Sequence, residues 1–268
     1  MLNSVICGDC LDVMKGIPDS YIDLTVTSPP YDNLRTYNGF VFDFEGIAEE
    51  LYRVTKPGGV VVWVVGDATV KGSETGTSFR QALYFMEAGF NLHDTMIYLK
   101  NGAAYPAGKR SNRYSQVFEY MFVFSKGRPS KFNLIKDKPN KWAGTKTFGE
   151  SSNRQINGVL KKSGKRTVGE LGYRDNVWQI NNGAGYGSKD ALSKAHPATF
   201  PEQLAEDHIL SWSNEGDIVL DPMCGSGTTC KTALSNSRQY IGIDISDEYC
   251  EIARQRIADL KSTSLEPL

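Results

Sequence analysis

The chain has 268 residues, of which 40% are hydrophobic and 23% charged, and its formal net charge is −1. This composition is typical of a globular protein with one large or two small domains, and it excludes collagen-like, mucin-like and wholly disordered chains. The longest apolar stretch, 58–66, falls far short of the roughly 20 residues that cross a bilayer, so no membrane partner is expected.

Strand-like and helical patterns alternate from the start of the chain to about residue 125. The sequence predicts strands at 23–27, 60–65, 92–99 and 117–125 and helices at 44–55 and 78–87. Residues Val60–Val65 are apolar throughout, as expected of a strand that is buried on both faces of a parallel sheet. Such alternation indicates a doubly wound α/β sheet.

Between 126 and 175 this periodicity disappears, and Gly, Asn, Ser and Lys dominate. Residues 126–194 hold 15 Lys and Arg but 5 Asp and Glu, a net charge of +10, so the rest of the chain carries −11. Aromatic residues such as Trp142 and Tyr173 are interspersed, which is unusual for a flexible linker. A basic block in an acidic scaffold indicates a surface that binds a polyanion, although a solvated lysine-rich loop has the same composition.

The α/β pattern returns at about residue 176. The sequence predicts strands at 218–220 and 240–243 and helices at 201–212, 228–235 and 246–260. Pro201 suits the first turn of its helix, and Ser246 suits the N-cap of the last one. The chain therefore divides into two α/β stretches separated by the basic segment.

A glycine-containing segment, Asp221-Pro222-Met223-Cys224-Gly225-Ser226-Gly227-Thr228-Thr229, directly follows the strand at 218–220. Its glycines allow the backbone to pass close to a ligand where the next helix begins. The Gly-Lys-Ser/Thr element of a P-loop is absent, which argues against ATP or GTP hydrolysis. Asp244 ends the next strand, where an acid accepts hydrogen bonds from ribose hydroxyls. The arrangement predicts a site for a nucleoside-containing cofactor, and the alternative is a tight structural turn.

A second motif, Ser28-Pro29-Pro30-Tyr31, follows the strand at 23–27. Its two prolines stiffen the backbone and remove two amide donors. Carbonyl oxygens, a hydroxyl and an aromatic face remain, and these suit a planar ligand that carries an amino group. For an isolated motif, the alternative is a rigid turn with a packed tyrosine.

Together with Thr27, these two segments resemble the motifs of the amino-methylating DNA methyltransferases, which modify cytosine N4 or adenine N6 with S-adenosylmethionine. Because the catalytic motif precedes the cofactor motif, the chain resembles the circularly permuted β group. The resemblance extends to 7–10, 101–126, 176–180, 196–201 and 241–256, and it covers nearly everything outside 126–175. The family usually has Phe where Met223 stands, and Met is an adaptable apolar side chain that can still pack against the cofactor.

The resemblance implies a Rossmann-like, S-adenosylmethionine-dependent methyltransferase sheet of the α/β class, circularly permuted, with an inserted target-recognition region. Residues 1–125 would form the catalytic half of the core, 126–175 the insert, and 176–268 the cofactor-binding half of the same core. The implied catalytic residues are Ser28, Pro29, Pro30 and Tyr31. The implied cofactor-binding residues are Asp9, Cys10, Phe200, Asp221, Pro222, Cys224, Gly225, Gly227, Thr228, Thr229 and Asp244. The residues expected to bind DNA are Arg110, Arg113, Lys141, Arg154, Lys161, Lys162, Lys165 and Arg166.

The implied reaction is methylation of an exocyclic amine on a base that has left the duplex and stacks on Tyr31. Ser28 at the first position of its motif favours cytosine N4, and adenine N6 is the alternative. Two other functions stay open: methylation of a protein glutamine or an RNA amine, and non-catalytic binding of DNA. The permuted order and the basic insert argue against the former, and the intact motifs argue against the latter.

The cysteines carry little further information. Cys7-x-x-Cys10 has the spacing of a metal or redox motif, but no second such pair exists, so no metal site is predicted. Five cysteines, an odd number, favour a reducing, cytoplasmic setting over a disulfide framework. The expected partner is double-stranded DNA, and both a restriction endonuclease partner and a homodimer are left open.

Overall fold

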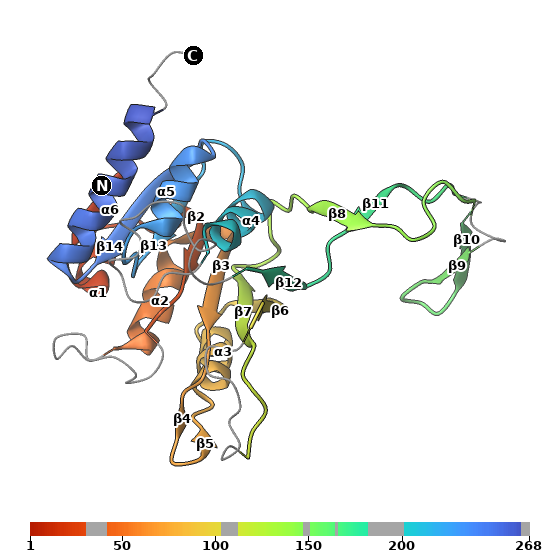
Figure 1. Ribbon diagram of the computed structural model, residues 1–268, viewed down its shortest axis with the longest axis horizontal. Helices are drawn as coiled ribbons and strands as arrows, with labels where there is room; N and C mark the ends of the chain where they lie inside the picture. Colours follow the sequence, from red (N-terminus) through yellow and green to blue (C-terminus); the bar gives the residue numbers. More distant parts are fainter. Residues whose placement is uncertain (31–41, 103–111, 147–150, 164–165, 182–200, 264–268) are drawn as a thin grey trace. The chain divides into compact units, whose positions relative to one another are not determined.

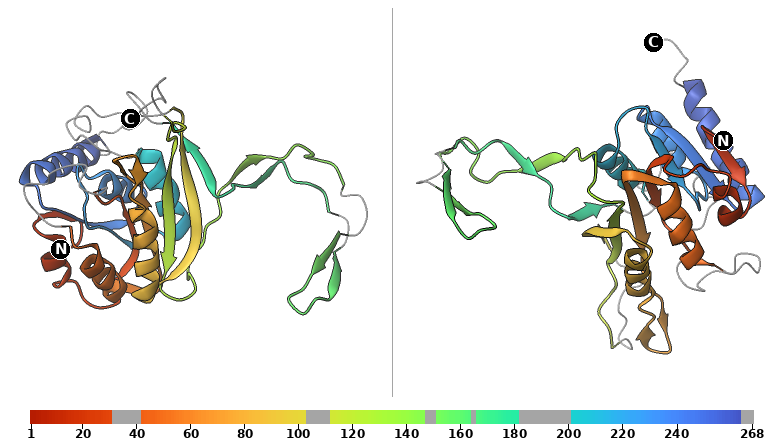
Figure 2. Two further views of the ribbon diagram at one scale, coloured as in Figure 1. Left: turned by 90° about the horizontal axis from the view of Figure 1, so that it is seen from below. Right: turned by 180° about the vertical axis from the view of Figure 1, so that it is seen from behind.

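The computed structural model describes residues 1–30, 42–102, 112–146, 151–163, 166–181 and 201–263, with the backbone alone at 151–154, 162–163 and 263. The chain forms two compact units. Unit 1 comprises Met1–Asn133 and Asn176–Leu268, and unit 2 comprises Leu134–Asp175. In unit 1, helices lie on both faces of a central sheet (Figures 1 and 2).

The central sheet has eight strands in the order β1-β14-β13-β2-β3-β7-β6-β12. The strands are β1 (Ser4–Cys7), β2 (Ile22–Thr27), β3 (Thr55–Val65), β6 (Asn91–Lys100), β7 (Phe118–Ser125), β12 (Val177–Ile180), β13 (Ile218–Asp221) and β14 (Gln239–Asp244). A separate short ladder joins β4 (Thr69–Val70) to β5 (Ser73–Glu74). The first and last strands of the chain pair in parallel, so both ends of the sequence build one side of the sheet.

Within the described ranges, three helices cover each face of the sheet. One face carries α1 (Cys10–Met14), α2 (Phe44–Val54) and α3 (Thr77–Glu87), and the other carries α4 (Glu202–Trp212), α5 (Thr228–Ser235) and α6 (Asp247–Thr263). The predicted apolar side of α2 is buried at Ile47, Leu51 and Val54. Pro201 is the N-cap of α4, one position before the predicted first turn. The doubly wound α/β fold is therefore confirmed.

Aromatic packing fills the core between the sheet and α3. Trp63 is fully buried, and its indole N–H donates to Gln81 Oε1 over 2.9 Å. The rings of Phe85 and Phe124 stack with their centroids 4.5 Å apart. Because the indole has its partner, the buried tryptophan carries no uncompensated polar atom.

The sheet is not wholly parallel. Strand β7 runs antiparallel to both of its neighbours, β3 and β6. Antiparallel neighbours need no helical crossover, and the sequence predicts no helix between 99 and 117. The alternation of strands and helices indicates a parallel sheet only where helices connect the strands.

Strand β3 begins at Thr55, five residues before its predicted start at Val60. Its pairing with β2 shifts register between Ile22 and Leu24, so Lys56-Pro57-Gly58-Gly59 forms an irregularity within the strand. Gly58 has a φ of +81°, a backbone conformation that favours glycine. The predicted helix 44–55 does end before this segment, at Val54, and the segment itself is a local distortion within β3.

Unit 2 consists of short two-stranded ladders. Strand β8 (Lys136–Pro139) pairs with β11 (Leu171–Tyr173), and β9 (Ser151–Arg154) pairs with β10 (Leu160–Ser163). All four residues of β8 are exposed. A strand that buries neither face has no reason to alternate apolar and polar residues, which explains why the sequence shows no periodicity here.

A buried ion cluster anchors the chain of unit 1 just before unit 2 begins. The Asp23 carboxylate, 7% exposed, accepts hydrogen bonds from Lys56 Nζ at 2.7 Å, Lys131 Nζ at 2.9 Å and the Ile218 N–H at 3.0 Å. Burial acts to raise the pKa of Asp23, but these donors outweigh it, and the pKa lies below its ordinary value. Lys131 therefore supports the core and is not part of an open basic surface.

We expect Asp23→Asn to lower the free energy of unfolding by about 1–3 kcal/mol at pH 7, because the amide replaces a charged acceptor of three donors. A lowered native pKa stabilises the fold above the unfolded pKa, so the penalty should shrink as the pH falls below about 4. Urea denaturation at pH 7 and pH 3.5 measures both values. Lys15→Ala, which breaks the exposed Lys15–Asp12 pair, is the control and should change stability by less than about 1 kcal/mol. Equal effects of the two substitutions would contradict the role of Asp23.

Candidate active site

The described residues of the two predicted motifs lie at one edge of the sheet. Strands β1, β14, β13, β2 and β3 run parallel, so their carboxyl ends meet at this edge. Cys7 pairs with Asp244 across β1 and β14, and Asp221 pairs with Gly242 across β13 and β14. Both predicted motifs, at 28–31 and 221–229, therefore begin at neighbouring strand ends.

The segment 221–229, here called the glycine loop, turns tightly between β13 and α5. The Cys224 N–H donates to the Ile243 carbonyl over 2.8 Å, and the Gly227 N–H donates to the Cys224 carbonyl over 2.7 Å. Gly227 has a φ of +77°, and a Cβ there would lie 2.7 Å from the Cβ of Ala253. A side chain at 227 would therefore force the loop away from α6.

The side chains of the glycine loop point mostly into the protein. Pro222, Cys224, Thr228 and Thr229 are buried. Met223 is partly buried and packs against the core cluster. The loop is therefore a packed turn whose side chains and N–H groups are largely satisfied within the protein.

Asp244 ties the end of β14 to the glycine loop. Its Oδ2 accepts the Gly225 N–H over 2.8 Å, and its Oδ1 accepts the Ser246 N–H over 2.9 Å. Burial raises the pKa of Asp244 above its ordinary value. Each carboxylate oxygen has a second lone pair, so the group retains capacity to accept hydroxyl donors from a ligand.

Asp221 connects the two motifs. The carboxylate is 2% exposed, and its Oδ1 accepts the Thr27 hydroxyl over 2.8 Å and the Met223 N–H over 3.2 Å. Burial raises the pKa of Asp221 to about 6. These contacts lie inside the protein, so Asp221, the first residue of the glycine loop, stabilises the loop against β2.

Two of the predicted cofactor-binding residues, Asp9 and Cys10, lie just beyond the end of β1. Asp9 is the N-cap of α1, and its Oδ1 accepts the Leu11 N–H over 2.8 Å. Cys10 is partly buried, and burial together with the Asp9 charge raises the pKa of its thiol to about 12. The thiol is therefore neutral at physiological pH and acts as a small apolar group.

The catalytic motif is described only in part. Ser28 and Pro30 are partly exposed and Pro29 is buried at the end of β2. Tyr31 lies outside the described residues, and so does the predicted cofactor residue Phe200. Their roles stay predictions.

The residues expected to bind DNA divide into several groups. Arg113 lies in unit 1 and binds the Gly72 carbonyl and Glu74. Lys141, Lys161 and Arg166 are exposed in unit 2, and the Lys141 Nζ lies 5.6 Å from the centroid of the Trp142 ring. Arg154 and Lys162 lie on β9 and β10 with the backbone alone described, and Arg110 and Lys165 lie outside the described residues.

Two residues outside the predicted site list stand out in the structure. Arg256, which the resemblance over 241–256 already includes, supports the glycine loop, and Asp67, which the sequence did not single out, binds the first turn of α3. Arg256 of α6, 2% exposed, donates to the Ser226 carbonyl and to Ser226 Oγ at 3.0 Å, and pairs with Glu202 Oε1 at 3.0 Å. Asp67 follows β3, beside β2, and accepts the Ser78 N–H over 2.9 Å. In the sequence, Asp67 is recognisable as an acid that follows a predicted strand, and Arg256 as a cation on the apolar side of a predicted helix.

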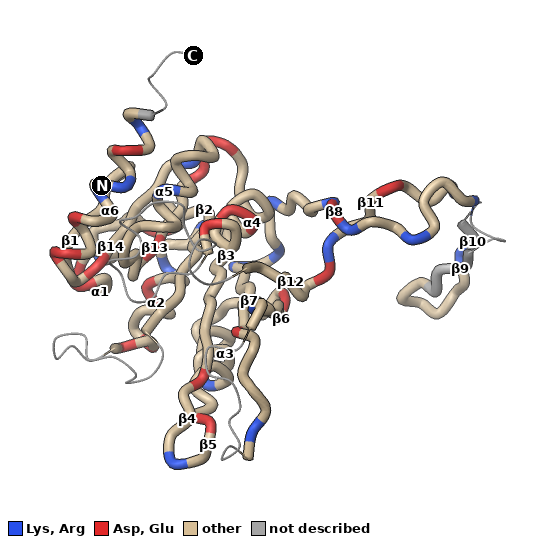
Figure 3. Tube along the Cα trace, in the orientation of Figure 1, with Lys and Arg blue, Asp and Glu red and all other residues tan. Residues whose placement is uncertain are grey.

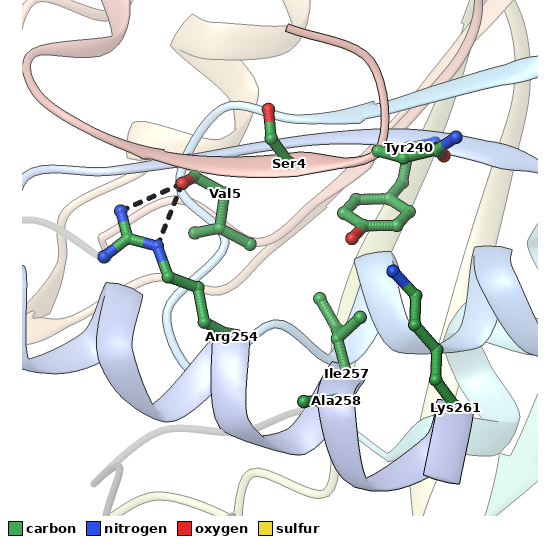
Figure 4. A pocket seen from close by; sticks show the side chains of 8 residues that line it. Ser4, Val5, Tyr240, Arg254, Ile257, Ala258 and Lys261 are labelled. Atoms are coloured by element: carbon green, nitrogen blue, oxygen red, sulfur yellow. Dashed lines mark hydrogen bonds between the residues drawn. The ribbon is translucent and has the colours of Figure 1, made fainter.

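A hollow of about 290 Å³ lies at the amino ends of β1 and β14, where it is lined by residues that include Ser4, Tyr240 and Lys261 (Figure 4). In this hollow Arg254 donates two hydrogen bonds to the Val5 carbonyl. The predicted cofactor residues occupy the opposite ends of the same strands, so the hollow is not part of their site. Among the described residues, no three His, Cys, Asp or Glu side chains are grouped to hold a metal ion. In the same part of the chain, every helix is too short or too polar to span a bilayer.

The carboxyl-edge glycine loop and the acid at the end of the next strand define a class of proteins, the doubly wound α/β proteins that bind nucleoside-containing ligands. A family model described as DNA methylase, for N6 and N4 methyltransferases, matches residues 22–255. The orphan methyltransferase M.BamHII of Bacillus amyloliquefaciens is 59% identical over 244 residues, 91% of each chain. The type II methyltransferase M.HpaI of Haemophilus parainfluenzae is 31% identical over 268 residues, covering 94% of this chain and 73% of its own.

Solved structures have the same fold. The PvuII cytosine-N4-specific DNA methyltransferase has a TM-score of 0.69 and 23% identity, covering 97% of this chain and 91% of its own. The M1.HpyAVI–SAM complex has a TM-score of 0.60 and 21% identity, covering 94% and 98%. The chain belongs to the DNA methylase family, whose members transfer a methyl group from S-adenosylmethionine to an exocyclic amine of DNA. The predicted resemblance is thus confirmed.

We expect Asp244→Ala to weaken S-adenosylmethionine binding by about 1.5–3 kcal/mol, the range for hydrogen bonds to a charged group. Isothermal titration calorimetry measures the affinity, and a melting curve confirms that the variant is folded. The control is Asp247→Ala, which removes an exposed carboxylate three residues further on and should change the affinity by less than about 0.5 kcal/mol. An unchanged affinity in Asp244→Ala would remove Asp244 from the cofactor site.

Proposed function

We propose that the protein is a site-specific methyltransferase that transfers the methyl group of S-adenosylmethionine to N4 of cytosine in double-stranded DNA. The observation that carries this proposal is Ser28, a neutral hydroxyl at the end of β2, one residue from the hydrogen bond that joins β2 to the glycine loop. Membership of the DNA methylase family supports the chemistry. The name of the PvuII enzyme supports cytosine N4.

Catalysis in this proposal is positioning combined with electrostatics. The exocyclic amine is a weak nucleophile because its lone pair is delocalised into the ring. Hydrogen bonds from the amine to the Ser28 hydroxyl and the Pro29 carbonyl would favour a tetrahedral nitrogen and localise that pair. The nitrogen then attacks the sulfonium methyl in line, S-adenosylhomocysteine leaves, and the amine releases one proton.

Two motif residues that lack a donor N–H suit this task. Pro29 and Pro30 place no amide hydrogen beside a ligand amine, which itself needs acceptors. Tyr31 would stack on the target base after it leaves the duplex. The base at Ser28 then faces the glycine loop, whose backbone, with Asp9, Cys10 and Asp244, would hold the cofactor.

Adenine N6 is the second candidate, because the same acceptors suit its amine. A carboxylate at the first motif position would be a stronger acceptor than the Ser28 hydroxyl, and the neutral residue is the reason for preferring cytosine. Methylation of a protein glutamine or an RNA amine finds no support in the family model, which is described as DNA methylase, or in the name of the PvuII DNA methyltransferase.

Unit 2, within the predicted insert 126–175, is proposed as the target-recognition region. It holds 10 Lys and Arg but 4 Asp and Glu, and its basic residues recur along the trace (Figure 3). Trp142, 65% exposed, lies beside Lys141, and such a pair can contact bases and phosphates together. Several cations of the block have internal partners instead: Lys126 binds the Tyr52 carbonyl, and Arg174 pairs with Asp137.

Three further predictions concern the setting of the enzyme. All five cysteines are free thiols, which supports a reducing, cytoplasmic location. A restriction endonuclease partner and a homodimer are both left open. The relative M.BamHII carries the name orphan methyltransferase.

Mass spectrometry of nucleosides from DNA treated with the pure protein and S-adenosylmethionine should detect N4-methylcytosine. Ser28→Ala should lower the rate of its formation by about 10–100-fold, since it removes one of two acceptors of the amine. Its control is Ser20→Ala, a substitution in the turn before β2. N6-methyladenine as the only product would overturn the choice of base, and the absence of any methylated nucleoside would overturn the proposed function.

Replacing residues 136–173 with a short Gly-Ser linker should abolish specific DNA binding and leave S-adenosylmethionine binding intact. The join is short because the Arg174 N–H donates to the Ile135 carbonyl over 3.0 Å, and the replacement spares Lys131 and its ion cluster. In the intact protein, log affinity for DNA should fall with log salt by about 0.9 for each phosphate contact. Filter binding and calorimetry measure the two affinities. A shortened protein that still methylates the same site would contradict the recognition role.

A further inference from the structure

The backbone ladder between β2 and β13 does not reach the active site. Its registered pairs are Val219 with Leu24 and Leu220 with Thr25. Ser28 lies three residues beyond the last of these pairs along the β2 side, and Gly225 lies five residues beyond it along the β13 side. Backbone pairing between these strands therefore does not determine how the two motifs sit relative to each other.

Two side-chain contacts join the strands beyond that ladder. The Thr27 hydroxyl donates to Asp221 Oδ1 over 2.8 Å, and the Thr229 hydroxyl donates to the Val26 carbonyl over 3.1 Å. Thr27 is fully buried, as is its β-strand neighbour Val26. Asp221 Oδ1 also accepts the Met223 N–H over 3.2 Å. One oxygen thus receives a donor from each motif.

We propose that Thr27 is a positioning residue for methyl transfer: through Asp221, its hydroxyl sets the position of Ser28 relative to the glycine loop. The inference rests on the proposed function, because it assigns the target amine to Ser28 and the cofactor to the loop. Thr27 touches neither substrate in this proposal. It acts through the adjacent residue on one side and through the Asp221 carboxylate on the other.

The distance between the two motifs matters because the reaction is a direct displacement. The amine nitrogen and the methyl carbon must approach to about 3–3.5 Å in line, and an error of about 1 Å can cost about 100-fold in rate. A valine at 27 keeps the β-branched shape but has no donor for Asp221. The two motifs would then be joined by the Thr229 contact and by packing alone.

The test compares Thr27→Val, Thr27→Ser and Thr25→Val in single-turnover methylation of duplex DNA. Thr25 is the matched control: it is fully buried on the same strand, and within the described part of the chain its hydroxyl has no hydrogen-bond partner. We expect Thr27→Val to lower the rate by 10–100-fold while the affinities for S-adenosylmethionine and DNA change by less than about threefold. Thr27→Ser should recover most of the rate, and Thr25→Val should match the wild type.

The pH profile provides a readout that a merely structural role would not move. The donors around the Asp221 carboxylate come from β2 and the glycine loop, and the charged group that faces it is Asp244 on β14. Burial raises the pKa of Asp221 to about 6, against the opposing effect of the Thr27 hydroxyl. Loss of that hydroxyl should raise this pKa further, so the acid limb of the Thr27→Val rate profile should move to higher pH.

The outcomes separate the inference from the proposed function. Wild-type rates in Thr27→Val would overturn the inference alone, since the wild-type protein would still methylate DNA. The inference would also be overturned if a smaller fraction of active enzyme fully explained the rate loss and the acid limb of the pH profile did not move. An inactive wild-type protein would overturn the proposed function. If Thr27→Val does not fold, Thr27→Ala makes the same comparison with a smaller side chain.

Discussion

The site depends on the parallel pairing of β1, β14, β13 and β2. This pairing brings the first residues of the chain beside the last strand, and it places the strand that ends in Thr27 beside the strand that ends in Asp221. Parallel strands end at a common edge, so two motifs almost 200 residues apart in sequence begin side by side. The order of the motifs in the sequence therefore does not change the geometry of the site, because β1 and β14 pair within the same sheet.

Three charged side chains stabilise the glycine loop from the interior of the protein. Asp221 of β13, Asp244 of β14 and Arg256 of α6 each contact its backbone or its serine. Asp221 and Arg256 are buried, and Asp244 is partly buried. Charged groups in such positions need well-placed partners, because an unsatisfied buried charge is costly. These contacts preorganise the loop at the carboxyl edge of the sheet. A methyltransferase that acts by positioning its two substrates requires a rigid loop there, and it requires no reactive side chain from the loop.

The sequence predicts those parts of the fold that are determined by interactions between residues close together in the chain. Continuous apolar runs such as Val60–Val65 predict buried strands, and an acid or a glycine after such a run predicts a ligand edge. The direction of β7 and the irregularity at Gly58 depend on which strands become neighbours, which no local pattern encodes. Strand β8 of unit 2 has no buried face, so its residues show no alternation. Arg256 and Lys131 look like surface cations until tertiary packing supplies their partners.

A crystal structure with S-adenosylmethionine and a DNA duplex tests the arrangement most directly. The account predicts the ribose hydroxyls within hydrogen-bond distance of Asp244, the sulfonium methyl facing Ser28, and an extruded cytosine with its amine on the Ser28 hydroxyl and the Pro29 carbonyl. A cofactor found at the amino ends of the strands, or one whose methyl group faces away from Ser28, would contradict it.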